Sequence, residues 1–206
     1  MSPAARQRIQ IAISVLWLIV VGFGTGMLWK YSNTPNPDPT PPAHWPTATT
    51  IPRTDSRATL VMFVHPRCSC TSASMGELAI LMARCQGLVN ARVVFFRPRG
   101  SREDWTHSDL WRAAAIIPGV TVQADEDGRE ARLFHAATSG HTALYDAQGQ
   151  LVFDGGITAS RGHSGDNDGR DAITALLHGK TPARAQTTVY GCLILKPESK
   201  LTDGVK

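Results

Sequence analysis

Residues 58–71 read ATLVMFVHPRCSCT, an apolar run followed by a proline and two cysteines one residue apart. The run from Ala58 to Val64 is short, apolar and rich in strand-forming residues, which predicts a buried β-strand. Apolar residues at helical spacing in residues 71–85 predict an amphipathic helix directly after it. Cys68 and Cys70 are therefore expected at the point where a strand gives way to a helix.

This position favours reactive sulfur. The start of a helix offers unpaired N–H groups and the positive end of the helix dipole, and both stabilise a thiolate relative to a thiol. His65 and Arg67 add possible positive charge beside the two sulfurs. The pattern predicts thiol chemistry or soft-metal binding, and it argues against two merely structural cysteines.

An apolar stretch near the N-terminus predicts a membrane anchor. No residue from Ile11 to Leu28 is charged, so residues 9–29 are predicted to form one transmembrane helix. Arg6 and Arg8 place residues 1–8 in the cytoplasm as a short tail, with the rest of the chain on the periplasmic or extracytoplasmic side. A cleaved signal peptide is the alternative, but its apolar core would be unusually long and no Ala-x-Ala site follows, so an uncleaved signal-anchor is expected.

Three further regions follow the anchor. Residues 30–52 contain seven prolines and predict an extended linker, whose part from Ser32 to Pro52 would span roughly 60 Å in polyproline II geometry. Residues 53–182 alternate strand and helix patterns, which predicts an α/β domain with a sheet flanked by helices. Residues 183–206 form a C-terminal extension that contains Cys192.

The expected elements of the domain are few and evenly spaced. Cys85 lies on the apolar stripe of the first helix and is expected to pack in the core. A long loop, residues 155–169, precedes the last helix. The elements in chain order are a strand at 58–64, a helix at 71–85, a strand at 91–96, a helix at 103–116, a strand at 120–124, a short helix at 129–137, a hairpin of strands at 142–146 and 150–154, and a helix at 170–178.

Charge and cysteine count limit the function. The net charge of +4 is not gathered into a basic run, so no nucleic-acid partner is expected. Outside the cytoplasm the four cysteines each need a disulfide partner, a metal, a reductant or burial.

The order of elements resembles the thioredoxin fold over roughly Ala58 to Gly179, which implies a central mixed sheet. The chain looks most like the membrane-anchored thioredoxin-like proteins of bacterial cell envelopes, which implies a single-pass protein of the inner membrane. The resemblance rests on the spacing from Phe63 to Cys68 and on the runs QADEDG at 123–128 and ALYDAQG at 143–149. The runs HPRCSCT at 65–71, GGIT at 155–158 and RGH at 161–163 are similar to the RedB-like subgroup.

The resemblance implies a thiol–disulfide oxidoreductase without a cofactor, acting on envelope protein thiols or with a thiol–disulfide electron donor. Cys68 would be the attacking thiol and Cys70 the resolving thiol. Thr71 stands where thioredoxins have their second cysteine, and Gly140 stands where they have a cis-proline. A Cys68–Cys70 disulfide would need a non-helical turn and would be strained and oxidising.

Other residues are candidates for the same site. Cys192 lies in a strand-like return, residues 187–194, that either docks near the cysteine pair as a third catalytic thiol or buries its sulfur. The residues expected to border the substrate cleft are His65, Pro66, Arg67, Gly140, His141, Arg161 and His163.

Two alternative functions remain open. Cys68, Cys70 and His141, with His65 nearby, could hold copper, because thiolates suit Cu(I) and imidazole is tolerated. That plan is similar to the copper chaperones of cytochrome oxidase assembly. A redox-inactive binding module that kept only the fold is the third hypothesis.

Overall fold

The apolar run at residues 58–64 forms the middle strand of a five-stranded sheet in a computed structural model, which describes residues 2–36 and 39–194. The order of strands is β3-β2-β1-β4-β5. β1 (Ala58–Val64) and β2 (Val89–Arg97) run parallel, as do β2 and β3 (Val120–Glu126). β4 (His141–Tyr145) runs antiparallel to both β1 and β5 (Leu151–Gly155). The expectation of a mixed sheet is confirmed.

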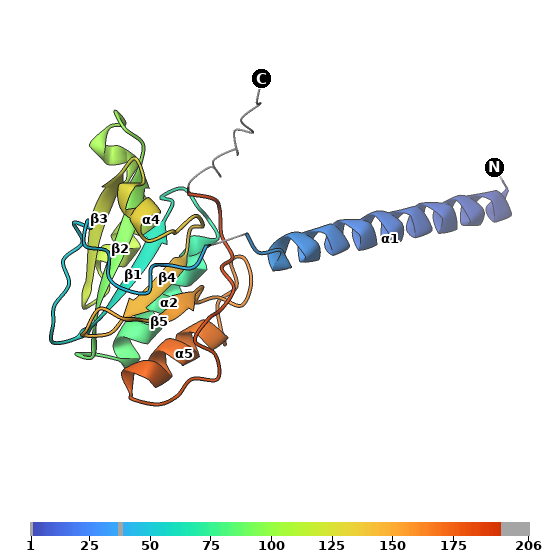
Figure 1. The fold of residues 1–206 in the computed structure, drawn as a ribbon. Helices are drawn as coiled ribbons and strands as arrows, with labels where there is room; N and C mark the ends of the chain where they lie inside the picture. Colours follow the sequence, from blue (N-terminus) through green and yellow to red (C-terminus); the bar gives the residue numbers. More distant parts are fainter. Residues whose placement is uncertain (1, 37–38, 195–206) are drawn as a thin grey trace, which may run out of the picture. The chain divides into compact units, whose positions relative to one another are not determined.

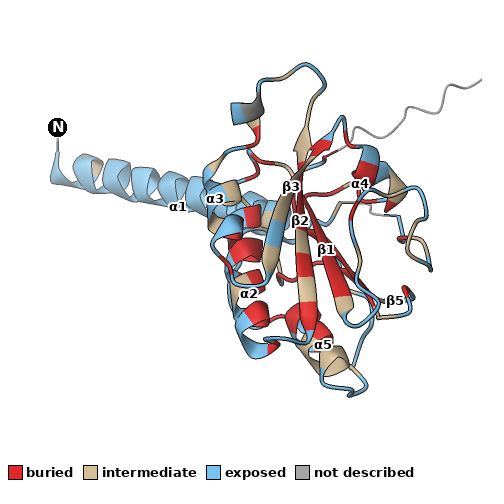
Figure 2. Ribbon diagram, turned by 90° about the vertical axis from the view of Figure 1, so that its left-hand side faces the viewer, coloured by how far each residue is buried: buried red, intermediate tan, exposed pale blue. Residues whose placement is uncertain are grey.

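Both faces of the sheet are covered (Figure 1). Leu60, Met62 and Val64 share one core cluster with residues of α2 (Thr71–Arg84), α3 (Asp109–Ala115) and α5 (Asp168–Leu177). Val61 and Phe63 share the other cluster with residues around α4 (Arg129–Leu133). Figure 2 shows the buried strands between these helices. Because every side chain of β1 meets a covered face, the strand is apolar at nearly every position rather than at alternate ones.

The helix expected at residues 103–116 is two elements. A short 3-10 helix, η1 (Glu103–Trp105), is separated from α3 by three residues. The Ser108 side chain accepts a hydrogen bond from the Trp111 N–H and caps α3. Serine at an N-cap starts a new helix rather than continuing an old one, which explains the break.

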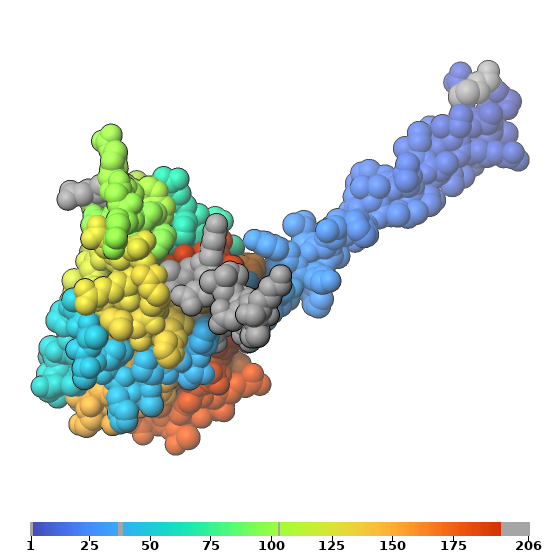
Figure 3. All heavy atoms as spheres, turned by 45° about the horizontal axis from the view of Figure 1, so that its top comes forward, coloured from blue at the N-terminus to red at the C-terminus, as the bar shows by residue number. Residues whose placement is uncertain are grey.

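The proline-rich segment after the anchor differs from the extended spacer that was expected. Its described residues 39–52 pack on the domain: the Tyr145 hydroxyl donates to the Pro42 carbonyl over 2.9 Å, and Ile51 is buried. The Trp45 ring lies edge-on to those of Phe134 and Tyr145, at 5.2 Å between centroids in each case. In Figure 3 the light-blue surface of the residues before β1 lies against the yellow surface of the residues around α4. The aromatic contacts hold these residues to the sheet despite their proline content.

The N-terminal residues form a separate unit that ends at Thr34. Helix α1 (Pro3–Asn33) begins with a cap at Ser2 and has a mean hydropathy of 2.2 in its most apolar window, none of which is buried. Figure 2 shows α1 exposed along its length. Among the described residues it is the one helix long and apolar enough to cross a membrane.

Candidate thiol site

The cysteine pair lies in the turn that joins β1 to α2. The Cys68 N–H donates to the His65 carbonyl over 3.0 Å, and the Thr71 N–H donates to the Cys68 carbonyl over 3.2 Å. Cys70 is the N-cap residue of α2 and already has helical backbone angles. The expected position at a strand-to-helix junction is confirmed, and Cys68 enters the interior while Cys70 stays partly exposed.

The third cysteine arrives on the C-terminal segment, here defined as residues 186–194. The Ser139 N–H donates to the Cys192 carbonyl over 2.8 Å, and the Ile194 N–H donates to the Ala137 carbonyl over 2.7 Å. The segment therefore pairs with the chain just before β4, with an antiparallel bridge between Thr138 and residue 193. This pairing brings Cys192 from the end of the chain to the start of α2.

Gly191 allows this close pairing. A Cβ atom at Gly191 would lie 1.9 Å from the Ser139 carbonyl oxygen, where no side chain fits. The Gly191 carbonyl accepts hydrogen bonds from the Asn36 side chain, over 2.7 Å, and from the Arg161 guanidinium. The two side chains also bond to each other over 3.2 Å. Arg161 thus holds the C-terminal segment in place. Its expected position on the rim of a substrate cleft stays a prediction.

The three sulfurs form one cluster. The Sγ atoms of Cys68, Cys70 and Cys192 all lie within 4.8 Å of one another. Cys68 is completely buried, whereas Cys70 and Cys192 are partly exposed, and none of the three is in a disulfide. Cys85 is buried in the core at the end of α2, as predicted. The cluster is close enough for thiol–disulfide exchange after small movements of the side chains.

Hydrogen bonds stabilise the Cys68 thiolate. Burial alone would raise the pKa of Cys68, but side-chain and backbone hydrogen bonds from Cys192 and Thr71 outweigh it and hold the pKa below its ordinary value of 9.0. Bonds donated to the charged form of a group favour that form. The stabilising groups are therefore hydrogen-bond donors, rather than the charges of His65 and Arg67 that the sequence suggested.

Cys192 has the opposite tendency. Burial, the hydrogen bond to Cys68 and the negative charges of Cys68 and Cys70 raise the pKa of Cys192 to about 12, against a smaller effect of Arg161. The Cys192 S–H consequently donates to the Cys68 thiolate. Of the two sulfurs, Cys68 is therefore the one that more readily carries the negative charge.

A patch of side chains beside the cysteines, here called the aromatic patch, consists of His65, Phe96 and Trp105 with Arg67 lying over Trp105. The His65 ring stacks on Phe96 at 6.1 Å and meets Trp105 edge-on at 5.6 Å. Arg67 lies over the Trp105 ring at 5.1 Å, a cation–π contact. Burial and the neighbouring Arg67 charge lower the pKa of His65, so its ring is neutral at pH 7. Pro66, between them, is buried.

Gly140 and His141 lie at the start of β4. Gly140 has φ +94°, a conformation that favours glycine, and its N–H donates to the Phe63 carbonyl over 2.8 Å. The His141 Nε2 atom lies 2.7 Å from Oδ1 of Asp154, and both side chains are largely buried. His141 is thus engaged by Asp154, and the described cluster of close metal-ligand atoms contains the three cysteines instead.

Two residues of the site, Thr71 and Ser139, were not among the site residues predicted from the sequence. Thr71 donates to Cys68, and its hydroxyl lies 2.7 Å from the Ser139 hydroxyl. Ser139 also accepts the His65 N–H over 2.9 Å. The position of Thr71 directly after the cysteine pair could have suggested a role, whereas nothing in the sequence near Ser139 links it to the site.

His163, which was expected to border the substrate cleft, is exposed on the long loop of residues 155–169.

A buried ion pair fixes the loop of residues 155–169 against α2. Arg170 donates to the Glu77 carboxylate, and both side chains are at most 5% exposed. Glu77 also accepts the Gly165 N–H over 2.7 Å and the Asn167 amide over 3.3 Å. The Asn167 side chain caps α5 by accepting from the Arg170 N–H. The loop that carries Arg161 is therefore anchored through α2, the helix that begins at the cysteines.

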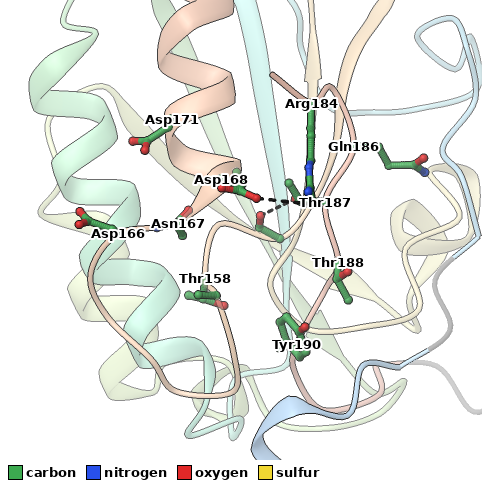
Figure 4. Close-up of a pocket in the computed structure, with 13 residues that line it drawn as sticks. Thr158, Asp166, Asn167, Asp168, Asp171, Arg184, Gln186, Thr187, Thr188 and Tyr190 are labelled. Carbon is green, nitrogen blue, oxygen red and sulfur yellow. Dashed lines mark hydrogen bonds and ion pairs between the residues drawn. The ribbon is translucent and has the colours of Figure 1, made fainter. Parts of the chain in front are cut away.

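A polar cavity of about 590 Å³ lies beside the C-terminal segment. Figure 4 shows Arg184 facing Asp168 at the start of α5, and these side chains form an ion pair at 3.7 Å. Thr187, Thr188 and Tyr190 also line the cavity. None of the four cysteines lines it, so this cavity is separate from the sulfur cluster at the start of α2.

Comparisons with known proteins find solved structures of similar fold. No protein-family model and no curated protein matches the sequence. A hypothetical protein from Sinorhizobium meliloti is 25% identical, with a TM-score of 0.56 over 68% of this chain and 80% of that one. An uncharacterized conserved protein from Geobacillus kaustophilus is 20% identical, with a TM-score of 0.57 over 81% of this chain and 95% of that one.

Another similar structure is the exposed lipoprotein thioredoxin of Streptococcus pneumoniae, 18% identical with a TM-score of 0.45, over 61% of this chain and 86% of that one. The sheet order and the cysteine-bearing turn between β1 and α2 agree with the resemblance found in the sequence. By its sheet topology and its cysteine-bearing turn the chain has the thioredoxin-like fold expected from the sequence, preceded by one long apolar helix.

Proposed function

We propose that this chain is a membrane-anchored thiol–disulfide redox protein that acts on the thiols of cell-envelope proteins. The observation that carries the proposal is the hydrogen-bonded Cys68 sulfur with two further thiols inside 4.8 Å. Cys68 is the attacking thiol in this account. The run at residues 65–71 supports placing the chain in the RedB-like subgroup.

The reaction has two exchange steps. The Cys68 thiolate attacks a substrate disulfide, so that a bond from Cys68 to one substrate sulfur forms and the other sulfur leaves as a thiolate. A second thiolate of the protein then attacks Cys68, forms an internal disulfide and releases the remaining substrate thiolate. The substrate gains two electrons and the protein loses two. The same steps in reverse oxidise a substrate dithiol.

We assign the second step to Cys192 in preference to Cys70, which was the resolving thiol expected from the sequence. Cys192 is the sulfur that hydrogen-bonds directly to Cys68. Cys70, by contrast, is the N-cap residue of α2, and a Cys68–Cys70 bond would require rearranging that cap. Cys70 lies within the same 4.8 Å and is available for a later exchange with the Cys68–Cys192 disulfide.

The charge of Cys68 determines when Cys192 becomes reactive, and so sets the sequence of the two steps. While Cys68 is a thiolate, its charge and its hydrogen bond help raise the pKa of Cys192, which keeps Cys192 protonated and unreactive. Once Cys68 is bound to a substrate sulfur, that charge is gone and the pKa of Cys192 falls. Resolution therefore starts only after the mixed disulfide has formed.

Access to Cys68 requires movement of the C-terminal segment. Cys68 is completely buried, and Cys192 is among the groups in contact with it. A substrate sulfur reaches Cys68 when residues 191–194 move away from residues 137–139. The aromatic patch of His65, Phe96, Trp105 and Arg67 lies beside this opening and offers a surface for the substrate polypeptide.

The anchor sets the compartment in this proposal. Helix α1 spans the membrane, and Arg6 and Arg8 before its apolar core keep the N-terminus in the cytoplasm. The domain then faces the periplasmic or extracytoplasmic side of a bacterial inner membrane, where disulfides persist.

Trapping of substrates tests the proposal. In cells that produce the Cys192→Ser variant, resolution is blocked and mixed disulfides between Cys68 and its substrates accumulate. They are detected after acid quenching and alkylation as bands that a reductant removes. The Cys68→Ser variant traps nothing, and Cys85→Ala serves as the matched control with normal turnover. Absence of Cys68 adducts in every variant would contradict the proposed function.

A further inference from the structure

We propose that Cys68, Cys70 and Cys192 form a three-thiolate site for one Cu(I) ion. The proposal uses the same three thiols as the redox function but does not require that they form disulfides. It differs from the copper site expected from the sequence, in which His141 was the third ligand.

The three sulfurs are placed for one ion. A metal at the centre of three thiolates, each about 2.3 Å away, separates the sulfurs by about 4.0 Å. The Sγ atoms here all lie within 4.8 Å of one another, so small rotations of the side chains bring them to that distance. The ligands come from two segments that the fold holds together, the start of α2 and the C-terminal segment.

The ligand type selects the ion. Thiolates are soft ligands that favour Cu(I) over hard cations such as Mg²⁺ or Ca²⁺. Structural zinc prefers four ligands in a closed tetrahedron, whereas the group of mutually close ligand atoms in the described part of the chain has three members. Three thiolates suit Cu(I), which accepts trigonal coordination, whereas zinc would need a water or an added ligand in the fourth position.

The surroundings hold the ligands in place. The Cys192 backbone is bonded to Ser139, and the preceding carbonyl at Gly191 is bonded to Arg161 and Asn36. Such outer contacts orient metal ligands and tune their affinity. Arg161 also lies close enough to Cys192 to interact with its charge, which offsets part of the negative charge of three thiolates and one Cu(I).

His141 is engaged elsewhere. Its Nε2 atom lies 2.7 Å from Asp154, whose other carboxylate oxygen accepts the Gln186 amide over 3.0 Å. This contact connects β4 to the start of the C-terminal segment. His141 therefore supports the segment that delivers Cys192 and is not itself the third ligand.

The partial exposure of two ligands suits an exchangeable ion. Cys68 is buried, but Cys70 and Cys192 each retain some contact with solvent. An incoming thiol or thioether can reach the ion from the side of Cys70 and Cys192 and take it by ligand exchange. The chemistry of such a partner is that of another soft Cu(I) site.

The test uses the reduced full-length chain in detergent micelles without oxygen. Cu(I) is titrated in competition with a chromophoric Cu(I) chelator, and the expected result is one ion per chain. Cys68→Ser, Cys70→Ser and Cys192→Ser should each raise the dissociation constant at least tenfold, while the matched control Cys85→Ala leaves it unchanged. His141→Gln, whose side-chain amide can still donate to Asp154, should raise the dissociation constant much less than any of these three changes, with circular dichroism to check that each variant folds.

X-ray absorption on the wild-type protein gives a test that needs no variant. The expected spectrum has three sulfur neighbours at about 2.3 Å from copper. Two sulfurs and a nitrogen, together with loss of binding in His141→Gln but not in Cys192→Ser, would overturn the three-thiolate site. Absence of stoichiometric binding would overturn it as well.

A glutathione redox titration of the same preparation without copper separates the two proposals. A protein that forms a reversible disulfide but binds no Cu(I) refutes only the copper site. A protein that binds Cu(I) through three sulfurs but forms no disulfide refutes only the proposed redox function.

Discussion

Replacing Gly191 with alanine should release the C-terminal segment and expose Cys68. A Cβ atom at this position would lie 1.9 Å from the Ser139 carbonyl oxygen, whereas ordinary contact begins near 3.4 Å. The segment must therefore retreat by about 1.5 Å, which breaks the 2.8 Å bond from Ser139 to Cys192 and the neighbouring 2.7 Å bond from Ile194 to Ala137.

The size of the effect follows from those two bonds. At a net value of about 1 kcal/mol each, their loss favours the open segment by about 2 kcal/mol, or roughly thirtyfold in population. Because buried Cys68 reacts only when the segment opens, its alkylation should accelerate by a similar factor. The global free energy of unfolding should fall by no more than the same amount, about 2 kcal/mol, because the change destabilises the closed state and leaves the five-stranded sheet paired.

Alkylation of Cys68 measures this prediction. The reduced protein is treated with iodoacetamide at several pH values, so that changes in the thiolate fraction are separated from changes in access, and each cysteine is quantified by mass spectrometry. The matched control is Gly76→Ala in α2, where an added Cβ meets no atom within 4 Å. Equal Cys68 rates in wild type and Gly191→Ala would refute the covering role of the segment.

Three other predictions concern the thiolate and its support. Thr71→Val removes a hydroxyl that donates to Cys68, so the pKa of Cys68, measured from thiolate absorbance at 240 nm, should rise, and Thr71→Ser should restore it. Glu77→Gln leaves the buried Arg170 guanidinium without its main carboxylate and should lower the free energy of unfolding by about 3 kcal/mol in urea; a loss below about 1 kcal/mol would contradict this. The lowered pKa of Cys68 means that the unfolded state binds more protons just below pH 9.0, so the stability of the reduced protein should rise toward pH 9.0 relative to Cys68→Ser.

Much of the domain could be predicted from the sequence because its signals are local. The apolar run before the cysteines gave β1, the helical spacing after them gave α2, and the turn at residues 146–150 gave the hairpin of β4 and β5. Each depends on residues that are neighbours in the chain, and the tertiary contacts agree with them.

The parts that the sequence did not predict depend on long-range contacts. The proline-rich residues 39–52 were expected to extend freely, but the contacts of Trp45 and Ile51 with the domain hold them in place. The partner of His141 proved to be Asp154, and the thiolate donors proved to be Thr71 and Cys192. No periodicity in one sequence reveals which distant residues meet.

The most direct test of the central claim is a redox titration of the full-length chain in detergent micelles. The reduced protein is equilibrated with glutathione buffers from about −300 to about −120 mV, and differential alkylation with mass spectrometry gives the state of each cysteine. The account predicts one reversible two-electron couple in which Cys68 pairs with Cys192, while Cys85 stays reduced. Cysteines that remain unpaired over this whole range, or a couple that excludes Cys68, would contradict it.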